Sequence, residues 1–152
     1  MKNTQQAQAL RLQTGQWDAL SEDALCVRLP VFVQEQRVPL DEEVDQHDPV
    51  STHVVAYDDD EQPVATGRLL ANGHIGRLAV VQEWRGSGLG RRMLDRLIEL
   101  GWQAGHAELH LAAQCQAMDF YRKRGFVEYG GVFDDAGIEH VMMKLGADKD
   151  AQ

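Results

Sequence analysis

The sequence holds little cysteine, and this scarcity excludes two kinds of small scaffold. Cys26 and Cys115 are the two cysteines among 152 residues, too few and too far apart for a disulfide framework or a zinc site. We therefore expect free thiols in a reducing compartment. No metal is expected elsewhere either. The stretch 106–110 lacks the glutamate directly after its first histidine that a zinc helix requires, and 45–48 lacks the glycine and glutamate positions of a calcium loop.

Long apolar runs and an excess of positive charge are also missing. No run approaches the roughly 18 apolar residues that cross a bilayer, and the polar start MKNTQQAQ lacks the apolar centre of a signal peptide. We therefore expect no membrane partner and a cytoplasmic location. Lys and Arg number 15 against 24 Asp and Glu, a net charge of −9. Nucleic-acid binding, which needs clustered basic residues, is not expected, whereas a cationic amine substrate is compatible with the acidic surplus.

No internal repeat, low-complexity tract or linker divides the chain. We expect one domain from residue 7 to residue 146, with frayed ends at 1–6 and 147–152. Hydrophobic periodicity and turn residues then predict the elements. The expected strands are 9–13, 53–57, 63–71, 74–81, 108–113, 126–129 and 138–145. The expected helices are 17–36, which Pro30 kinks or divides, 88–104 and 116–124.

This order, β-α(α)-β-β-β-α-β-α-β-β, predicts the fold class. Strand 74–81, helix 88–104 and strand 108–113 form a βαβ unit, whose crossover is right-handed in nearly all proteins. We therefore expect an α/β fold with a mixed sheet and helices on both faces. The Asn72-Gly73 pair is a strong signal for a tight hairpin between the second and third sheet strands of this region. The stretch 38–49 is acidic and turn-like.

A glycine-rich loop precedes the helix expected at 88–104. It reads Arg85-Gly86-Ser87-Gly88-Leu89-Gly90, and its glycines let backbone N–H groups approach a ligand closely. Those groups and the positive end of the helix dipole favour an anion such as a pyrophosphate. A dinucleotide fingerprint would need glycine where Arg91 stands, and the lysine of a P-loop is absent. A glycine-rich turn without a ligand is the remaining alternative for this loop alone.

Four motifs in order carry a family resemblance. The loop matches R-x-x-G-x-G, and the surrounding IGRLAVVQEWRGSGLGRRML resembles the signature strand, loop and helix of the GNAT (GCN5-related) N-acetyltransferases. Downstream, LAAQCQAMDFYRKRGF is similar to the second signature of that family. The segments LPVFVQEQRVPLDEEVDQHD and FDDAGIEHVMMKL resemble the ElaA-like branch. The resemblance covers nearly the whole chain. It implies the GNAT, or acyl-CoA N-acyltransferase, fold.

The resemblance also implies a reaction and its residues. The chain is expected to transfer an acetyl group from acetyl-CoA, its co-substrate, to a primary amine by direct attack in a ternary complex. Tyr121 matches the family's general acid. Gln114 stands where many members have an asparagine that contacts the pantetheine arm, and the ElaA-like branch has glutamine there. The other residues expected to bind the cofactor are Leu78, Ala79 and Val80 on the strand and Arg85, Gly86, Ser87, Gly88, Leu89, Gly90 and Arg91 in the loop.

Several questions stay open at this point. The general base could be Glu35, His74 or His110, or a chain of waters. The acceptor could be a small amine, an antibiotic, a polyamine, or the N-terminus or a lysine of a protein. A non-catalytic acyl-CoA-binding module, a nucleotide-binding enzyme and a transferase of longer acyl chains are the alternative functions. A homodimer is a further expectation, because dimers are common among similar proteins.

Overall fold

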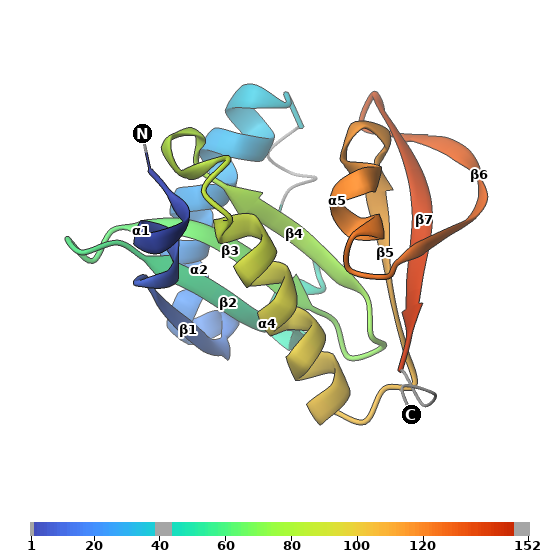
Figure 1. The fold of residues 1–152 in the computed structure, drawn as a ribbon, viewed down its shortest axis with the longest axis horizontal. Coiled ribbons are helices and arrows are strands. Elements are labelled where there is room, and N and C mark those ends of the chain that lie inside the picture. The colour runs from blue at the N-terminus through green and yellow to red at the C-terminus, as the bar shows by residue number, and fades with distance from the viewer. Residues whose placement is uncertain (1, 39–43, 148–152) are drawn as a thin grey trace.

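The computed structural model describes residues 2–38 and 44–147, and two antiparallel sheets form its centre (Figure 1). The strands are β1 (Arg11–Gln16), β2 (Thr52–Tyr57), β3 (Pro63–Leu69), β4 (Ile75–Val80), β5 (Glu108–Gln114), β6 (Val127–Asp135) and β7 (Ile138–Gly146). The α-helices are α1 (Thr4–Gln8), α2 (Trp17–Arg28), α4 (Leu89–Gln103) and α5 (Met118–Arg122). A π-helix, η1 (Leu29–Glu35), continues α2, and three short 3₁₀ turns are η2 (Asp48–Val50), η3 (Gln82–Trp84) and η4 (Cys115–Ala117).

The backbones of the two sheets pair at a single place. One sheet has the order β1-β2-β3-β4 and the other β5-β7-β6, with every ladder antiparallel. A parallel bridge between His74 and His110 links the base of β4 to β5. Above this bridge the two strands diverge (Figure 1). The mixed arrangement expected from the βαβ unit is thus present, but its parallel part is one bridge long.

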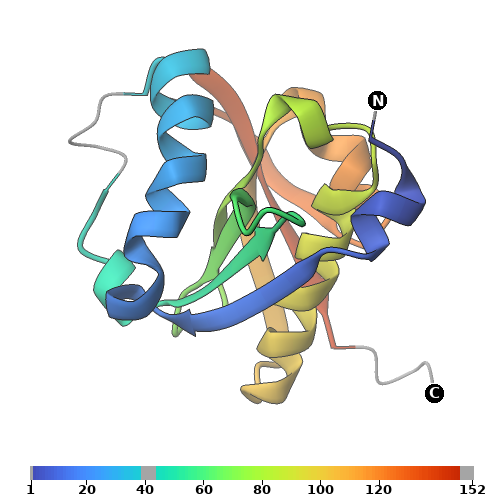
Figure 2. The same ribbon diagram turned by 90° about the vertical axis from the view of Figure 1, so that its left-hand side faces the viewer.

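Helices cover both faces of the four-stranded sheet, as predicted. Figure 2 shows α2 on one face and α4 with α1 on the other. The apolar face of α4 packs against the sheet, as is usual for an amphipathic helix. Its fully buried residues are Leu89, Met93, Leu94 and Leu97. Gly67 on β3 permits this close packing, because a Cβ there would lie 2.7 Å from Leu97 Cδ1. No helix in the described part of the chain is long and apolar enough to cross a membrane.

The start of the chain differs from the expectation, and the break at Pro30 agrees with it. Residues 4–6, expected to be frayed, begin α1, because the Asn3 side chain accepts from Gln6 N at 2.9 Å and the Gln6 side chain accepts from Asn3 N at 2.8 Å. This capping box satisfies amides that a short helix would otherwise expose. The break expected at Pro30 is confirmed, since α2 ends at Arg28 and a π-helix follows. Residues 148–152, and 39–43 of the acidic stretch, lie outside the described residues.

The last hairpin is longer than predicted. β6 was expected to end at Tyr129, where two glycines follow, but it continues to Asp135. Gly130 and Gly131 lie within the strand at a register shift rather than in a turn. The turn comes later, where Ala136 and Gly137 both have positive φ. Glycines in a strand can mark either a bulge or the end of the strand. The Gly130-Gly131 pair alone therefore did not show which of these two structures forms.

Candidate active site

The loop between β4 and α4 has the backbone geometry of an anion site. Gly86 and Gly88 have φ values of +78° and +91°, a left-handed conformation that glycine adopts without the strain of a Cβ. Gly88 is the N-cap of α4, and its carbonyl accepts the first bond of the helix from Arg92 N at 3.1 Å. The amides of the first helical turn have no intrahelical acceptor. They sit at the positive end of a fifteen-residue helix.

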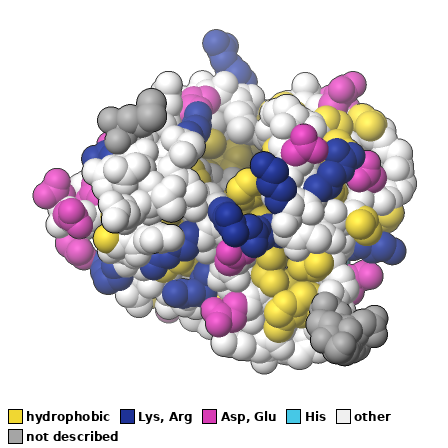
Figure 3. Space-filling model, viewed as in Figure 1, with side chains coloured by type: hydrophobic (Ala, Val, Ile, Leu, Met, Phe, Trp, Pro, Cys, Tyr) yellow, Lys and Arg dark blue, Asp and Glu magenta, His cyan; other side chains and the backbone are white. Residues whose placement is uncertain are grey.

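A cleft of about 550 Å³ lies beside this loop, between β4, α4 and α5. Four basic side chains and no acidic side chain line it among the described residues. Figure 3 shows Lys and Arg side chains gathered near the middle of this face, next to apolar ones. This local positive charge contrasts with the net charge of −9. The cleft therefore suits a long ligand that carries several negative charges on an otherwise apolar arm. Its basic residues are Arg85, Arg91, Lys123 and Arg124.

Most of the residues expected to bind the cofactor line this cleft. They are Leu78, Ala79, Val80, Arg85, Gly86, Gly88, Gly90 and Arg91. Ser87 and Leu89 are instead fully buried beneath the loop. The Ser87 hydroxyl donates to the Trp84 carbonyl oxygen and accepts from Leu89 N at 3.3 Å, so its side chain shapes the loop. Gln114 does not line the cleft; its amide donates to Gln36 Oε1 at 2.8 Å.

The strand beside the cleft carries a bulge. Thr66 on β3 pairs with Ala79, but Arg68, two residues on, pairs with Gly76, so β4 has one residue more than its partner. Arg77 within this bulge has a φ of +51°. A bulge interrupts the ladder and redirects the strand. It does so here directly before Leu78–Val80, the segment that faces the cleft, and it contributes to the divergence of β4 from β5.

Arg85 joins the loop to the end of the π-helix. Its Nε donates to the Val80 carbonyl oxygen at 2.9 Å and its guanidinium donates to Glu35 Oε1 at 2.8 Å. Both side chains are exposed, at 44% and 40%, so the pair itself is worth little in water. Glu35, one of the three side chains considered as a general base, is thus held at the anion loop.

Tyr121 lies on α5 against the same cleft. Phe120 and Phe126 meet its ring edge to face, with centroids 5.0 and 6.1 Å away. Burial raises the pKa of Tyr121 to about 12, because the phenolate would lose its hydration in this environment. The phenol therefore carries its proton at neutral pH. It can donate that proton to an anion that forms beside it.

The two histidines considered as bases lie at the junction of the sheets. His74 Nδ1 is 3.1 Å from His110 Nδ1, and His110 Nε2 is 3.3 Å from the Asn72 carbonyl oxygen. Burial lowers the pKa of His74 to about 4, with His110 contributing. A histidine with so low a pKa is a weak base at neutral pH.

A second, smaller cavity opens on the other side of Tyr121. Its volume is about 250 Å³, and it shares Leu78, Ala117 and Tyr121 with the cleft. Its remaining walls come from η1, β4, β5 and the last hairpin. The polar side chains in these walls are Gln36, His74, Arg77, Gln114, Asp135 and His140. We refer to it below as the second cavity.

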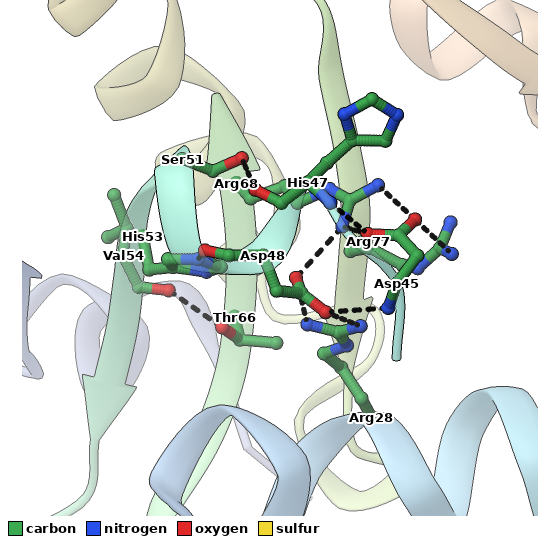
Figure 4. Close-up of polar contacts among 10 residues, drawn as sticks. All are labelled: Arg28, Asp45, His47, Asp48, Ser51, His53, Val54, Thr66, Arg68 and Arg77. Carbon is green, nitrogen blue, oxygen red and sulfur yellow. Dashed lines mark hydrogen bonds and ion pairs between the residues drawn. The ribbon is translucent and has the colours of Figure 1, made fainter. Parts of the chain in front are cut away.

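A buried ionic network beside the second cavity was not found from the sequence. Figure 4 shows the Asp48 carboxylate between Arg28 and Arg68, and Asp45 between Arg68 and Arg77. Burial alone would raise the pKa of Asp45, but the hydrogen bond and charge of Arg68, with Arg77 and the His47 amide, lower it to about 2. The available signal was a charged Arg68 within the apolar strand 63–71. The acidic run at 45–48, which does not match a calcium loop, supplies the carboxylates that pair with Arg68.

The comparisons with known proteins agree with this geometry. A sequence model described as "Acetyltransferase (GNAT) domain" matches residues 22–147. The uncharacterized N-acetyltransferase YjcF of Bacillus subtilis is 39% identical over 126 residues, which cover 80% of this chain and 89% of YjcF. ElaA of Escherichia coli is 29% identical over 130 residues, 78% of this chain and 82% of ElaA. An acyl-CoA N-acyltransferase from Pseudomonas aeruginosa superposes with a TM-score of 0.80 at 30% identity, covering 90% of this chain and 99% of that one. The fold expected from the motifs is confirmed.

Proposed function

Because the chain belongs to the GNAT acetyltransferase family, with ElaA among its relatives as the motifs predicted, we propose that it is an acetyl-CoA-dependent N-acetyltransferase. It transfers the acetyl group to a primary amine by direct attack within a ternary complex. The acceptor is a small molecule or a peptide. The basic, partly apolar cleft beside the glycine loop is the observation that carries this proposal.

The residues of the cleft fit acetyl-CoA in two respects. The amides before and within the first turn of α4, with Arg85 and Arg91 beside them, offer donors and positive charge to the diphosphate. Leu78 and Val80 from β4 and Phe120 from α5 form apolar walls for the arm that leads to the thioester. A backbone N–H near Ala79 supports the oxyanion that forms at the thioester carbonyl.

Tyr121 supplies the proton that the reaction needs at its end. The neutral amine adds to the carbonyl carbon, and collapse of the adduct breaks the C–S bond. The thiolate that leaves takes the phenol proton of Tyr121. With a pKa near 12, this phenol is a weaker acid than an ordinary thiol of pKa about 8.5. The proton transfer from Tyr121 to the thiolate therefore depends on the close placement of the two groups and on renewed protonation of the phenolate, and not on the acidity of the phenol.

Calorimetry with purified protein tests the first step. We expect acetyl-CoA and CoA to bind, and ATP and NAD to bind much more weakly. Arg85→Gln is expected to weaken acetyl-CoA binding about tenfold, because it removes a charge-assisted donor from the loop. Arg11→Gln is the matched control. Arg11 is as exposed, 47% against 44%, and also pairs with one glutamate, but it lies on β1 outside the cleft.

A thiol-release assay tests the transfer itself. Acetyl-CoA is mixed with the protein and with tyramine, spermidine or a lysine-containing peptide, and free CoA is measured over time. Acetyl-CoA binding without amine-dependent thiol release would favour the non-catalytic acyl-CoA-binding module instead. Faster turnover with a longer acyl-CoA would show that the acyl group is not acetyl. Cytoplasmic location and a homodimer stay predictions of the sequence.

A further inference from the structure

We propose that the second cavity receives the acceptor amine and that His140 accepts its proton. This inference rests on the proposed function. It concerns a residue that sequence reasoning did not consider as a base, although the G-I-E-H-V motif around it was singled out.

The second cavity meets the cofactor cleft at Tyr121. Leu78, Ala117 and Tyr121 line both spaces, so a thioester laid along β4 is accessible from the second cavity at this point. With a volume of about 250 Å³, the second cavity has room for the amino group of an acceptor and the atoms next to it. An unhindered primary amine fits this geometry.

The strand register aims His140 into the second cavity. Residues of β7 alternate between two faces, and Val141 and Met143 point into the core, where they are buried. His140 faces the opposite way, directly across from Gln114 on β5, which lines the same cavity. Phe133 of β6 stacks on the imidazole with centroids 5.8 Å apart. The residue is only 9% exposed, so its neighbours hold the ring in place.

The hydrogen bond of the ring fixes its tautomer. His140 Nδ1 lies 2.8 Å from the Ile138 carbonyl oxygen. A carbonyl oxygen only accepts, so Nδ1 must carry the hydrogen. Nε2 of the neutral ring then holds a lone pair. Within the described residues, no hydrogen-bond partner of Nε2 is present. This is the arrangement that a general base needs, because one nitrogen is anchored while the other is available.

The other candidates are less well placed. The Glu35 carboxylate pairs with Arg85 beside the anion loop and does not line the second cavity. His74 lines it, but its Nδ1 faces His110 and its lowered pKa makes it a weak base. His110 does not line the second cavity. Of the two histidines that line this cavity in the described chain, His74 is held to His110 and has the lowered pKa, so His140 is the better-placed base.

The charges around His140 favour binding of the amine in its protonated form, which must then lose a proton before it can attack. The titratable groups that share its cavities are Asp135 on β6, Arg77 and His74 near the bulge of β4, and Tyr121 on α5. Arg77 pairs with Asp45 at 3.2 Å, and His74 is neutral at pH 7. The Asp135 carboxylate therefore offers a counter-charge to an incoming ammonium group.

His140 Nε2 takes one proton from the ammonium group, and the neutral nitrogen forms its bond to the thioester carbonyl carbon. The C–S bond breaks, and the thiolate takes the Tyr121 proton. The second proton of the nitrogen returns to the Tyr121 phenolate, and His140 releases its proton to solvent. The products are the N-acetyl amine, CoA thiol and one proton.

His140→Asn tests this assignment. The Asn amide can keep the bond to the Ile138 carbonyl oxygen, but it has no group at the position of Nε2. At pH 7 we expect kcat/KM for spermidine, tyramine or the peptide, whichever the wild type acetylates fastest, to fall by about 10²- to 10⁴-fold. Affinity for acetyl-CoA should stay within twofold of the wild type, which also verifies folding. His140→Gln should lose activity similarly, whereas His110→Asn should keep it.

The pH profile separates a base from a structural residue. Wild-type kcat/KM should not follow the ionisation of the free amine, because His140 takes the proton from the bound ammonium group. Without the base, only amine that is already neutral in solution can react, so kcat/KM of His140→Asn should rise about tenfold per pH unit toward the amine pKa of about 10.4. The difference in kcat/KM between the wild type and His140→Asn should therefore become smaller at high pH.

Each other outcome has a defined meaning. Wild-type activity in His140→Asn, or a loss of equal size at every pH from 6 to 10, would overturn the role of His140. If the wild type binds acetyl-CoA but acetylates none of the three amines, the proposed function fails and the inference fails with it. Active wild type with an unaffected variant refutes the inference alone.

Discussion

Replacing Asp48 with asparagine removes one buried charge from the ionic network and leaves the side-chain shape almost unchanged. In the native protein, Asp48 Oδ1 accepts from Arg28 at 2.9 Å and from Arg68 at 2.8 Å, while Oδ2 accepts from Arg28 at 3.1 Å and from Asp45 N at 3.2 Å. Asp48 is fully buried, and Arg28 and Arg68 are 1% and 4% exposed. An amide would turn an –NH₂ group toward one of these donors.

The size of the effect follows from this burial. Removing one partner of a buried ion pair costs about 3–5 kcal/mol, because the other charge stays out of water. Asp48 faces two guanidinium groups, and Asp45 still balances Arg68, so we expect about 3–5 kcal/mol rather than twice that value. Domains of this size have a total stability of about 5–15 kcal/mol. Asp48→Asn should therefore be folded but easily unfolded.

Urea unfolding measures the change. The midpoint should fall while the slope stays constant, as expected when stability changes and the exposed surface does not. Glu61→Gln is the control, because the Arg11–Glu61 pair is exposed and should contribute less than about 1 kcal/mol. If Asp48→Asn costs no more than Glu61→Gln, the network does not stabilise the fold and the reasoning from burial is wrong.

Three further predictions follow from single contacts. The folded pKa of Asp45, about 2, lies below its ordinary 3.8. Asp45 therefore contributes about 2 kcal/mol to the free energy of unfolding above pH 4, and this contribution is lost as the pH falls toward 2. In Asp45→Asn, the urea midpoint should depend less on pH between pH 4 and pH 2 than in the wild type. Tyr121→Phe should lower turnover about 10²-fold or more with unchanged acetyl-CoA affinity by calorimetry, and wild-type turnover would exclude the phenol. Gly101→Ala should cost about 1–3 kcal/mol in thermal or urea unfolding, because its Cβ would lie 2.5 Å from Leu109 Cδ2 in a filled core, and an unchanged midpoint would show that Leu109 can move.

The sequence predicted the elements whose signals are local. The apolar stripe after Gly88 placed α4 within one residue at each end, and the glycine loop was recognised because left-handed residues before a helix need glycine. The Asn72-Gly73 hairpin was predicted correctly for the same reason, since Gly73 has a φ of +89°. These features depend on neighbours in the chain and on little else.

Features that depend on distant partners were not predicted. The hydrogen bond from the Gln114 amide to Gln36, 78 positions away, has no local signal, and the expected contact of Gln114 with pantetheine stays a prediction. Arg28 and Arg68 meet Asp48 only after α2, η2 and β3 have assembled. No local pattern distinguishes such a residue from a solvent-exposed one. The role proposed for His140 likewise depends on a tautomer that a single contact decides.

The divergence of β4 and β5 explains why a site forms at this place. Their backbones pair at the base, where His110 N donates to the Gly73 carbonyl oxygen at 3.1 Å. Beyond this point each strand is bonded on one side only within the described sheets. A free strand edge presents backbone N–H and C=O groups that need partners. An extended arm with its own amides can supply these partners from the cleft, as expected for pantetheine along Leu78–Val80. The same opening leaves Tyr121 accessible from the second cavity. Closing it with a continuous parallel ladder would satisfy the backbone but would remove the cleft and the second cavity at once, so the proposed transfer between two substrates depends on the incomplete pairing of the two sheets.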